Sequence, residues 1–283
     1  QAFIPIYSEY EKAENERKTY EFINAVAGTL ITILFIFTVL ILIFAPAFIF
    51  LFAPGFYFDP FKQDISVTVL RIMFPYLSLI SLVAFAGGIQ NTHNKYSVPA
   101  YTPVIFNLCL IIAAILIAPM YEMPIFVLAW GVLLAGILQL LIQILPLWQI
   151  KRLPVPKINF KNSGLRRFLK LVAPAILAGG IIQINLLVDT IFASLLETGS
   201  PTWLYVSDRL VQFPMGIFAI GIGTVLLPTL SKLDVISERK IFINTLQKGQ
   251  RFVLFIGIPS LIGLMFCAED IISAIFYLSL IHI

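Results

Sequence analysis

A long run without charge is the feature that most limits what this chain can fold into. No Asp, Glu, Lys or Arg occurs from Phe22 to Phe58, and about 20 consecutive apolar residues are enough for a helix to cross a bilayer. Only 12% of the 283 residues are charged, whereas charged residues make up about 25% of a typical soluble domain. The sequence therefore predicts an all-α polytopic membrane protein, because helices satisfy their own backbone hydrogen bonds inside lipid.

Comparable apolar stretches recur along the chain and predict about seven complete transmembrane helices. The seven spans are expected within residues 22–58 and at about 65–90, 98–120, 125–150, 171–196, 202–230 and 252–268. Residues 1–10 have the pattern of the last turns of another helix, so we expect a helix remnant there and a chain that is a fragment. Pro and Gly inside the stretches do not mark ends, because both are common in transmembrane helices.

Polar connections divide these spans into groups. The longest connection, 151–170, is basic and contains two prolines, so it predicts a linker between an incomplete N-terminal lobe, 1–150, and the start of a C-terminal lobe, 171–277. A second charged loop is expected at 231–251. The last six residues, 278–283, match the translated end of a transposon-library adapter, so we expect them not to be native.

The basic residues are distributed unevenly between the two sides of the predicted membrane protein. Of the 19 Lys and Arg residues, all but Lys62, Arg71 and Arg209 fall in connections on one side. Loops rich in Lys and Arg are retained on the cytoplasmic side of a membrane. The basic loops are therefore expected to be cytoplasmic, and Arg71, near the outer end of its span, is expected to reach the lipid headgroups.

Two adjacent charges, Asp208 and Arg209, lie inside a predicted span. An Arg near the bilayer centre costs roughly 2.5–3.5 kcal/mol on insertion scales, so it normally faces a bundle interior or a water-filled cavity. Residues at helical steps of three and four share one face. Those on the face of Arg209 are Thr202, Tyr205, Gln212 and Gly216. The span is therefore predicted to carry a polar stripe.

Each intramembrane charge has two interpretations. Asp208 and Arg209 form either a structural pair between helices or part of a substrate pathway, and buried ions usually find partners. Asp189 follows Asn185 by four residues in another span. It either accepts hydrogen bonds from a neighbouring helix or helps to bind a coupling cation.

The chemistry that an intramembrane enzyme needs is scarce in these spans. They lack a histidine cluster and a metal-ligand pattern, and Cys109 and Cys267 lie singly in apolar runs. A Gly-rich phosphate loop followed by Lys and Ser or Thr is also absent from the sequence. We therefore expect no enzyme, no metal site and no ATP-driven pump, but a transporter or a channel. Broken helices with a polar stripe favour an alternating-access carrier.

Five stretches of the chain resemble the MurJ/MviN family. They are Leu70–Tyr76, Asn91–Pro103, Val188–Ser194, Asp208–Pro214 and Gly223–Ser231. The resemblance runs in order from Gln1 to about Phe276. The family comprises bacterial inner-membrane flippases of lipid II, the undecaprenyl-pyrophosphate-linked peptidoglycan precursor, within the multidrug/oligosaccharidyl-lipid/polysaccharide exporter superfamily.

The resemblance implies a carrier of fourteen helices, built as two six-helix lobes around a central cavity, of which this chain covers the end of helix 2 to helix 9. Arg209 falls on the family's cavity arginine in helix 8, which implies that it binds substrate. The other residues expected at the substrate site are Asp208, Thr202, Tyr205 and Gln212. Gln212 stands where relatives often have Glu, so one charge is lost. Asp189 matches an acidic position of helix 7, which implies a coupling monovalent cation and no other cofactor.

The resemblance also implies partners and a location. Lipid II and membrane lipids are the expected partners, with no nucleic acid, and the expected location is the bacterial inner membrane. Two rival functions stay open within the same superfamily. A cation-coupled drug antiporter would favour an acidic and aromatic cavity rather than one with Arg, whereas a flippase of capsule or O-antigen precursors would share the need for cationic groups.

Overall fold

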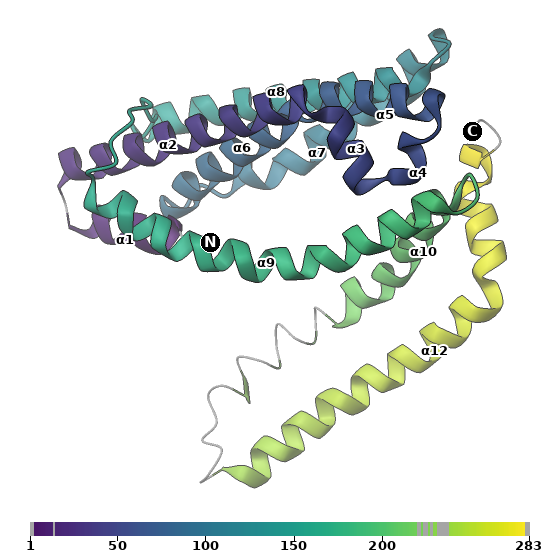
Figure 1. Cartoon of the computed structure of the whole chain (residues 1–283). Coiled ribbons are helices and arrows are strands. Elements are labelled where there is room, and N and C mark those ends of the chain that lie inside the picture. The colour runs from purple at the N-terminus through teal and green to yellow at the C-terminus, as the bar shows by residue number, and fades with distance from the viewer. Residues whose placement is uncertain are drawn as a thin grey trace. The chain divides into compact units, whose positions relative to one another are not determined.

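The computed structural model describes residues 3–13, 15–219, 222, 226, 229–230 and 238–280, and these residues are almost entirely helical (Figure 1). This confirms the all-α class. By packing, the chain falls into two compact units, Gln1–Glu197 and Thr198–Ile283, which are treated separately below.

The first unit contains most of the helices. They are α1 (Phe3–Lys12), α2 (Glu16–Ile43), α3 (Ala45–Phe52), α4 (Pro54–Tyr57), α5 (Pro60–Met73), α6 (Pro75–Thr92), α7 (Ser97–Ile112), the π-helix η1 (Ala113–Ile117), the 3-10 helix η2 (Ala118–Met120), α8 (Pro124–Gln149) and α9 (Ser163–Leu195). Helix α6 packs against α2 and α8, and α7 packs against α8 (Figure 1). The second unit contains α10 (Ser200–Pro214), the π-helix η3 (Met215–Ala219) and α12 (Arg239–Leu280).

The described helices include five that are long and apolar enough to cross a membrane. They are Glu16–Ile43, Pro60–Thr92, Ser97–Met120, Pro124–Gln149 and Arg239–Ile275. The span predicted at 171–196 lies within α9, and the span predicted at 202–230 begins with α10 and η3. Part of that last span, including residues 223–225, lies outside the described residues. The fold is that of a multi-pass membrane protein.

A proline breaks the first apolar run. Pro46 has no backbone N–H, so it cannot donate to the carbonyl of Leu42 as the helix would require. Helix α2 therefore ends before Phe44, and the chain continues as the short helices α3 and α4. The side chain of Arg71 replaces the missing donor, with its Nε 3.1 Å from the Leu42 oxygen. Arg71, which was expected to reach the headgroups, thus satisfies a backbone group of the neighbouring helix.

A second proline is accommodated inside α7. Pro103 leaves the carbonyl of Pro99 without its helical donor, and the hydroxyl of Thr102 donates to that oxygen at 2.8 Å. The carbonyl of Thr102 in turn accepts from Nε2 of Gln139 on α8 at 2.7 Å. Since Gln139 is fully buried, this contact ties α7 to α8 where lipid offers the backbone no alternative partner.

The best-packed core lies where the ends of several helices of the first unit meet. Its buried residues are Phe3, Ile6, Tyr7, Phe22, Ile23, Ala25, Val26, Ala86, Ile89, Leu147 and Leu165. Gly164 allows α9 to enter this core, because an added Cβ would lie 2.6 Å from the Tyr10 hydroxyl oxygen and 2.7 Å from Phe22 Cδ2. The first turn of α9 is therefore docked on α1 and α2.

Two predicted connections contain more helix than expected. The prediction of a charged loop at 231–251 is wrong from Arg239 onward, because α12 begins at that residue. Arg, Lys, Leu and Gln are good helix formers, so this charged segment can be helical. Its basic side chains are exposed on the helix surface. Residues 231–237 lie outside the described residues. In the connection 151–170, the side chain of Asn162 caps α9, which begins at Ser163.

The lobe division and the foreign tail stay predictions. Helix α9 packs with the first unit, which extends to Glu197, and this division by packing does not test the proposed lobes on either side of 151–170. Residues 278–280 continue α12. Residues 281–283 lie outside the described part of the chain.

Candidate functional site

The guanidinium of Arg209 is held on α10 by two side chains of the predicted stripe. Its Nη1 donates to Oε1 of Gln212 at 3.2 Å, and its central carbon lies 4.7 Å from the ring centre of Tyr205. Cation–π contacts of this kind contribute about 0.5–1 kcal/mol at exposed sites. Tyr205, Arg209 and Gln212 are thus brought together, as residues at steps of three and four on a helix should be.

The other predicted site residues of α10 make no such contact. Asp208 forms no ion pair with Arg209 within the described residues, because consecutive side chains on a helix point in different directions. Thr202 is exposed on the first turn of α10. Gly216 lies in η3. The charge of Arg209 is therefore not neutralised by a neighbouring acid in the described part of the second unit.

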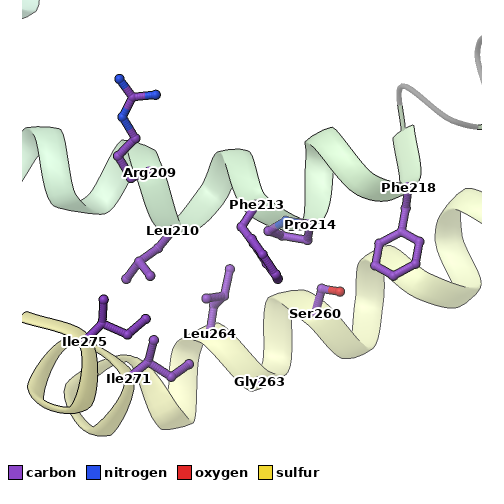
Figure 2. Close-up of a pocket in the computed structure, with 10 residues that line it drawn as sticks. All are labelled: Arg209, Leu210, Phe213, Pro214, Phe218, Ser260, Gly263, Leu264, Ile271 and Ile275. Carbon is purple, nitrogen blue, oxygen red and sulfur yellow. The ribbon is translucent and has the colours of Figure 1, made fainter. Parts of the chain in front are cut away.

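The opposite side of α10 is apolar and faces α12. Leu210, Phe213, Pro214 and part of Arg209 line one wall of a groove of about 490 Å³, and Leu264 and Ile271 line the other. In Figure 2, Leu210 and Phe213 point toward α12, whereas the guanidinium of Arg209 points away from it. Helix α10 thus separates an apolar packing face from a face that presents charge.

Asp189 lies on α9 in the first unit. Its side chain and that of Asn185 are exposed, and the two residues are one helical turn apart. No group of three or more His, Cys, Asp or Glu that could hold a metal ion occurs among the described residues. Asp189 and Asn185 together offer at most three side-chain oxygens, so a monovalent cation at this position would need further oxygens from elsewhere.

A part-buried ionic network that the sequence did not predict lies at one end of the first unit. Arg152 binds Glu11 at two points, from Nε to Oε1 at 2.7 Å and from Nη2 to Oε2 at 3.2 Å. The hydroxyl of Tyr7 donates to Glu11 Oε1 at 2.6 Å, and Nε2 of His93 lies 2.8 Å from that hydroxyl. Glu11 and Arg152 are 141 residues apart in the sequence, so no local pattern could have revealed their contact.

Burial and charge act in opposite directions on Glu11. Burial raises the pKa of its carboxyl, but hydrogen bonds from Arg152 and Tyr7 outweigh burial, and the pKa lies below the ordinary value. The hydrogen bond with Glu11 raises the pKa of Arg152, against the smaller effect of burial. Both groups are therefore charged at neutral pH and form a true ion pair.

The fold and the α10 site define a multi-pass helical membrane protein with a guanidinium on a polar helix face that has no acidic partner among the described residues. Such groups mark substrate or ion pathways in membrane carriers. The family described as "Lipid II flippase MurJ" matches residues 1–279. The chain belongs to this family.

Individual relatives agree with this assignment. "Probable lipid II flippase MurJ" of Haemophilus influenzae is 38% identical over 289 residues, which cover 98% of this chain and 57% of that protein. "Lipid II flippase MurJ" of Burkholderia cenocepacia is 33% identical over 280 residues, with 98% and 54% coverage. A solved structure, "Lipid II flippase MurJ, inward closed conformation", has a TM-score of 0.79 at 29% identity and covers 98% of this chain and 56% of its own. The chain thus spans little more than half the length of these relatives.

Proposed function

We propose that this chain serves in a transporter that flips lipid II from the cytoplasmic to the outer leaflet of the bacterial inner membrane. The protein is then a flippase and not an enzyme. Its membership of the MurJ family supports lipid II as the substrate. The observation that carries the proposal is the guanidinium of Arg209, which points away from α12 and has no acidic partner among the described residues.

The chemistry of lipid II explains why an arginine should serve here. A pyrophosphate concentrates negative charge that must cross a region of low dielectric constant. Guanidinium groups pair with phosphate oxygens at two points, whereas an ammonium offers a single point charge. Arg209 therefore suits the pyrophosphate of the substrate.

The neighbours of Arg209 favour an anionic ligand. The amide of Gln212 accepts a hydrogen bond from the guanidinium without neutralising it, as a carboxylate would. The ring of Tyr205 lies against the guanidinium and adds no charge to the site. Thr202 extends the polar surface, and its hydroxyl can donate to a phosphate or sugar oxygen. The carboxylate of Asp208 can only accept hydrogen bonds, so its proposed partners are hydroxyl or N–H groups of the substrate and not the pyrophosphate. Together these residues form the proposed substrate-binding face.

Energy coupling and orientation complete the proposal. Asp189 is the proposed ligand of a coupling monovalent cation, in an alternating-access cycle to which the inward closed conformation of one solved relative would correspond. The basic loops are proposed to face the cytoplasm. Lipid II and membrane lipids are the proposed partners, with no role for nucleic acid.

The test is genetic and chemical together. A full-length protein that carries this chain is expressed in a bacterium depleted of its own MurJ, and lipid II in the outer leaflet is quantified with growth. We expect restored growth and restored export of lipid II. Export of a capsule or O-antigen precursor without rescue of peptidoglycan synthesis would instead support the rival flippase.

A further inference from the structure

The connection between α8 and α9 is docked on α1 and α2 through residues 151–157. The connector, residues 150–162, has no helix of its own apart from turns. The N–H of Val155 donates to Oδ1 of Asn24 at 2.7 Å, and the N–H of Lys157 donates to the carbonyl of Asn24 at 3.0 Å. Gly28 permits this approach, because an added Cβ would lie 2.5 Å from the backbone of Lys157. The connector therefore lies directly on α2.

Burial of apolar side chains does not explain why the connector is docked. Ile150, directly after α8, packs against the core, but the large apolar residues beyond it are exposed, with 39% of Leu153, 58% of Val155, 62% of Ile158 and 57% of Phe160 in contact with solvent. Exposed side chains contribute little hydrophobic stabilisation. Two backbone hydrogen bonds at one asparagine are a modest restraint, since each is worth only about 0.5–1.5 kcal/mol net. Polar contacts at the ends of the connector must supply the rest.

Both ends of the connector meet a carboxylate of α1. At the start, Arg152 pairs with Glu11, and the side chains are only 11% and 19% exposed. Just beyond the other end, Arg167 on α9 pairs with Glu9, and these side chains are 57% and 54% exposed. Solvent weakens the exposed Arg167–Glu9 pair, here called the outer pair, and pairs of this kind often contribute almost nothing to stability. The Arg152–Glu11 pair, here called the inner pair, is therefore the stronger restraint on the connector.

The inner pair is also fixed by its surroundings. Tyr7 and His93 hold Glu11 from one side, and the guanidinium of Arg152 lies 5.2 Å from the ring centre of Tyr20. The hydroxyl of Tyr20 donates to the carbonyl of Lys151. Nη1 of Arg152 also donates to the carbonyl of Lys151 at 3.3 Å. Glu11 and Arg152 thus each have hydrogen-bond partners besides one another, which favours a stabilising rather than a costly ion pair.

We propose that the Glu11–Arg152 pair is a latch that keeps the connector docked on α1 and α2. When the latch is closed, the connector stays docked on α1 and α2. The first turn of α9, which follows the connector, packs on the same two helices. When the pair is broken, the connector loses its anchor, and the hydrogen bonds of Val155 and Lys157 to Asn24 open with it. The latch is thus a conformational device that decides whether the segment joining α8 to α9 is fixed or free.

Hydrogen exchange of the whole chain in detergent tests the latch without any transport assay. The amides of Val155 and Lys157 report docking directly. In Glu11→Gln and in Arg152→Gln we expect these two amides to exchange at least about tenfold faster, while the interior of α8 is unchanged. The matched control is Arg167→Gln, which removes the exposed pair and should change exchange at the same amides less than about twofold.

A charge exchange separates the latch from general damage. The double variant Glu11→Arg with Arg152→Glu should exchange more slowly at Val155 and Lys157 than Glu11→Arg alone or Arg152→Glu alone. If the single variants do not fold, recovery of folded protein in the exchanged pair supports the latch, and failure of the pair to recover overturns it. The latch is also overturned if folded Glu11→Gln and folded Arg152→Gln both exchange at the wild-type rate at Val155 and Lys157. It is likewise overturned if Arg167→Gln speeds exchange at these amides as much as they do. None of these results depends on the proposed substrate.

Discussion

The Nε of Arg71 lies 3.1 Å from the carbonyl oxygen of Leu42, the acceptor that a proline four residues later leaves without a helical donor. A backbone acceptor without a partner is costly at membrane depth. This single contact explains how the first apolar run can break next to α5 without an unsatisfied carbonyl. It also gives Arg71 a structural role that does not involve substrate.

The first prediction concerns this contact. Arg71→Ala should lower the free energy of unfolding by about 1 kcal/mol, because it removes the side-chain donor from the Leu42 carbonyl. Arg71→Lys should recover part of the loss, since an ammonium can also donate. Unfolding in detergent measures both, with Arg17→Ala as the control, because Arg17 forms only an exposed pair with Glu21 on one helix. Equal stability of all variants would contradict the capping role.

The second prediction concerns pH. Because the folded pKa of Glu11 lies below its ordinary value, its charged form stabilises the fold above the unfolded pKa. That stabilisation is lost as the pH falls through the lower, folded value. Thermal stability should therefore decline with acid more steeply in the wild type than in Glu11→Gln. Unfolding midpoints from pH 7 to pH 3 measure this difference, and parallel curves would rule out the contribution of Glu11.

The third prediction concerns the docking of α9. Gly164→Ala should destabilise the fold by about 1–3 kcal/mol, because the new methyl group would collide with Tyr10 and Phe22. Gly263→Ala is the matched control in α12, where nothing lies within 4 Å of the added Cβ. Alanine is the better helix former by about 1 kcal/mol, so the control should be neutral or stabilising. Two equal unfolding midpoints would mean that α9 is not packed on this core.

The fourth prediction concerns the proposed cation. If Asp189 binds a coupling cation in the full-length protein, Asp189→Asn should reduce the rise in melting temperature that sodium produces over choline. The substitution keeps the size of the side chain and removes its charge. Glu197→Gln, at an exposed acid after α9, is the control. An equal response to sodium in the wild type and in Asp189→Asn would remove Asp189 from the cation site.

Hydropathy and helical spacing predicted much of this fold. The uncharged run from Phe22 to Phe58 identified a membrane protein, and the spacing of Tyr205, Arg209 and Gln212 predicted side chains that do meet. Both signals can be read from one continuous segment of the sequence, without knowledge of contacts between segments.

Long-range contacts and helix boundaries could not be predicted in the same way. Glu11 and Arg152 each look like an ordinary charge in a polar connection, and only the folded chain brings them together. The start of α12 was missed because its charges indicated a loop, although Arg and Lys are good helix formers. The bond from Arg71 to Leu42 depends on the packing of α5 beside α2, which no single segment encodes.

The central claim is that Arg209 binds the pyrophosphate of lipid II, and its most direct test is the amount of lipid II exported per folded protein. In the full-length protein, Arg209→Ala should abolish export while the level of folded protein in the membrane stays normal. Arg209→Lys should recover less export than its charge alone would provide, because it lacks the two-point geometry. Arg239→Ala, an exposed arginine at the start of α12, should leave export unchanged. Normal export by folded Arg209→Ala would contradict the claim, and so would loss of export that only follows loss of folded protein.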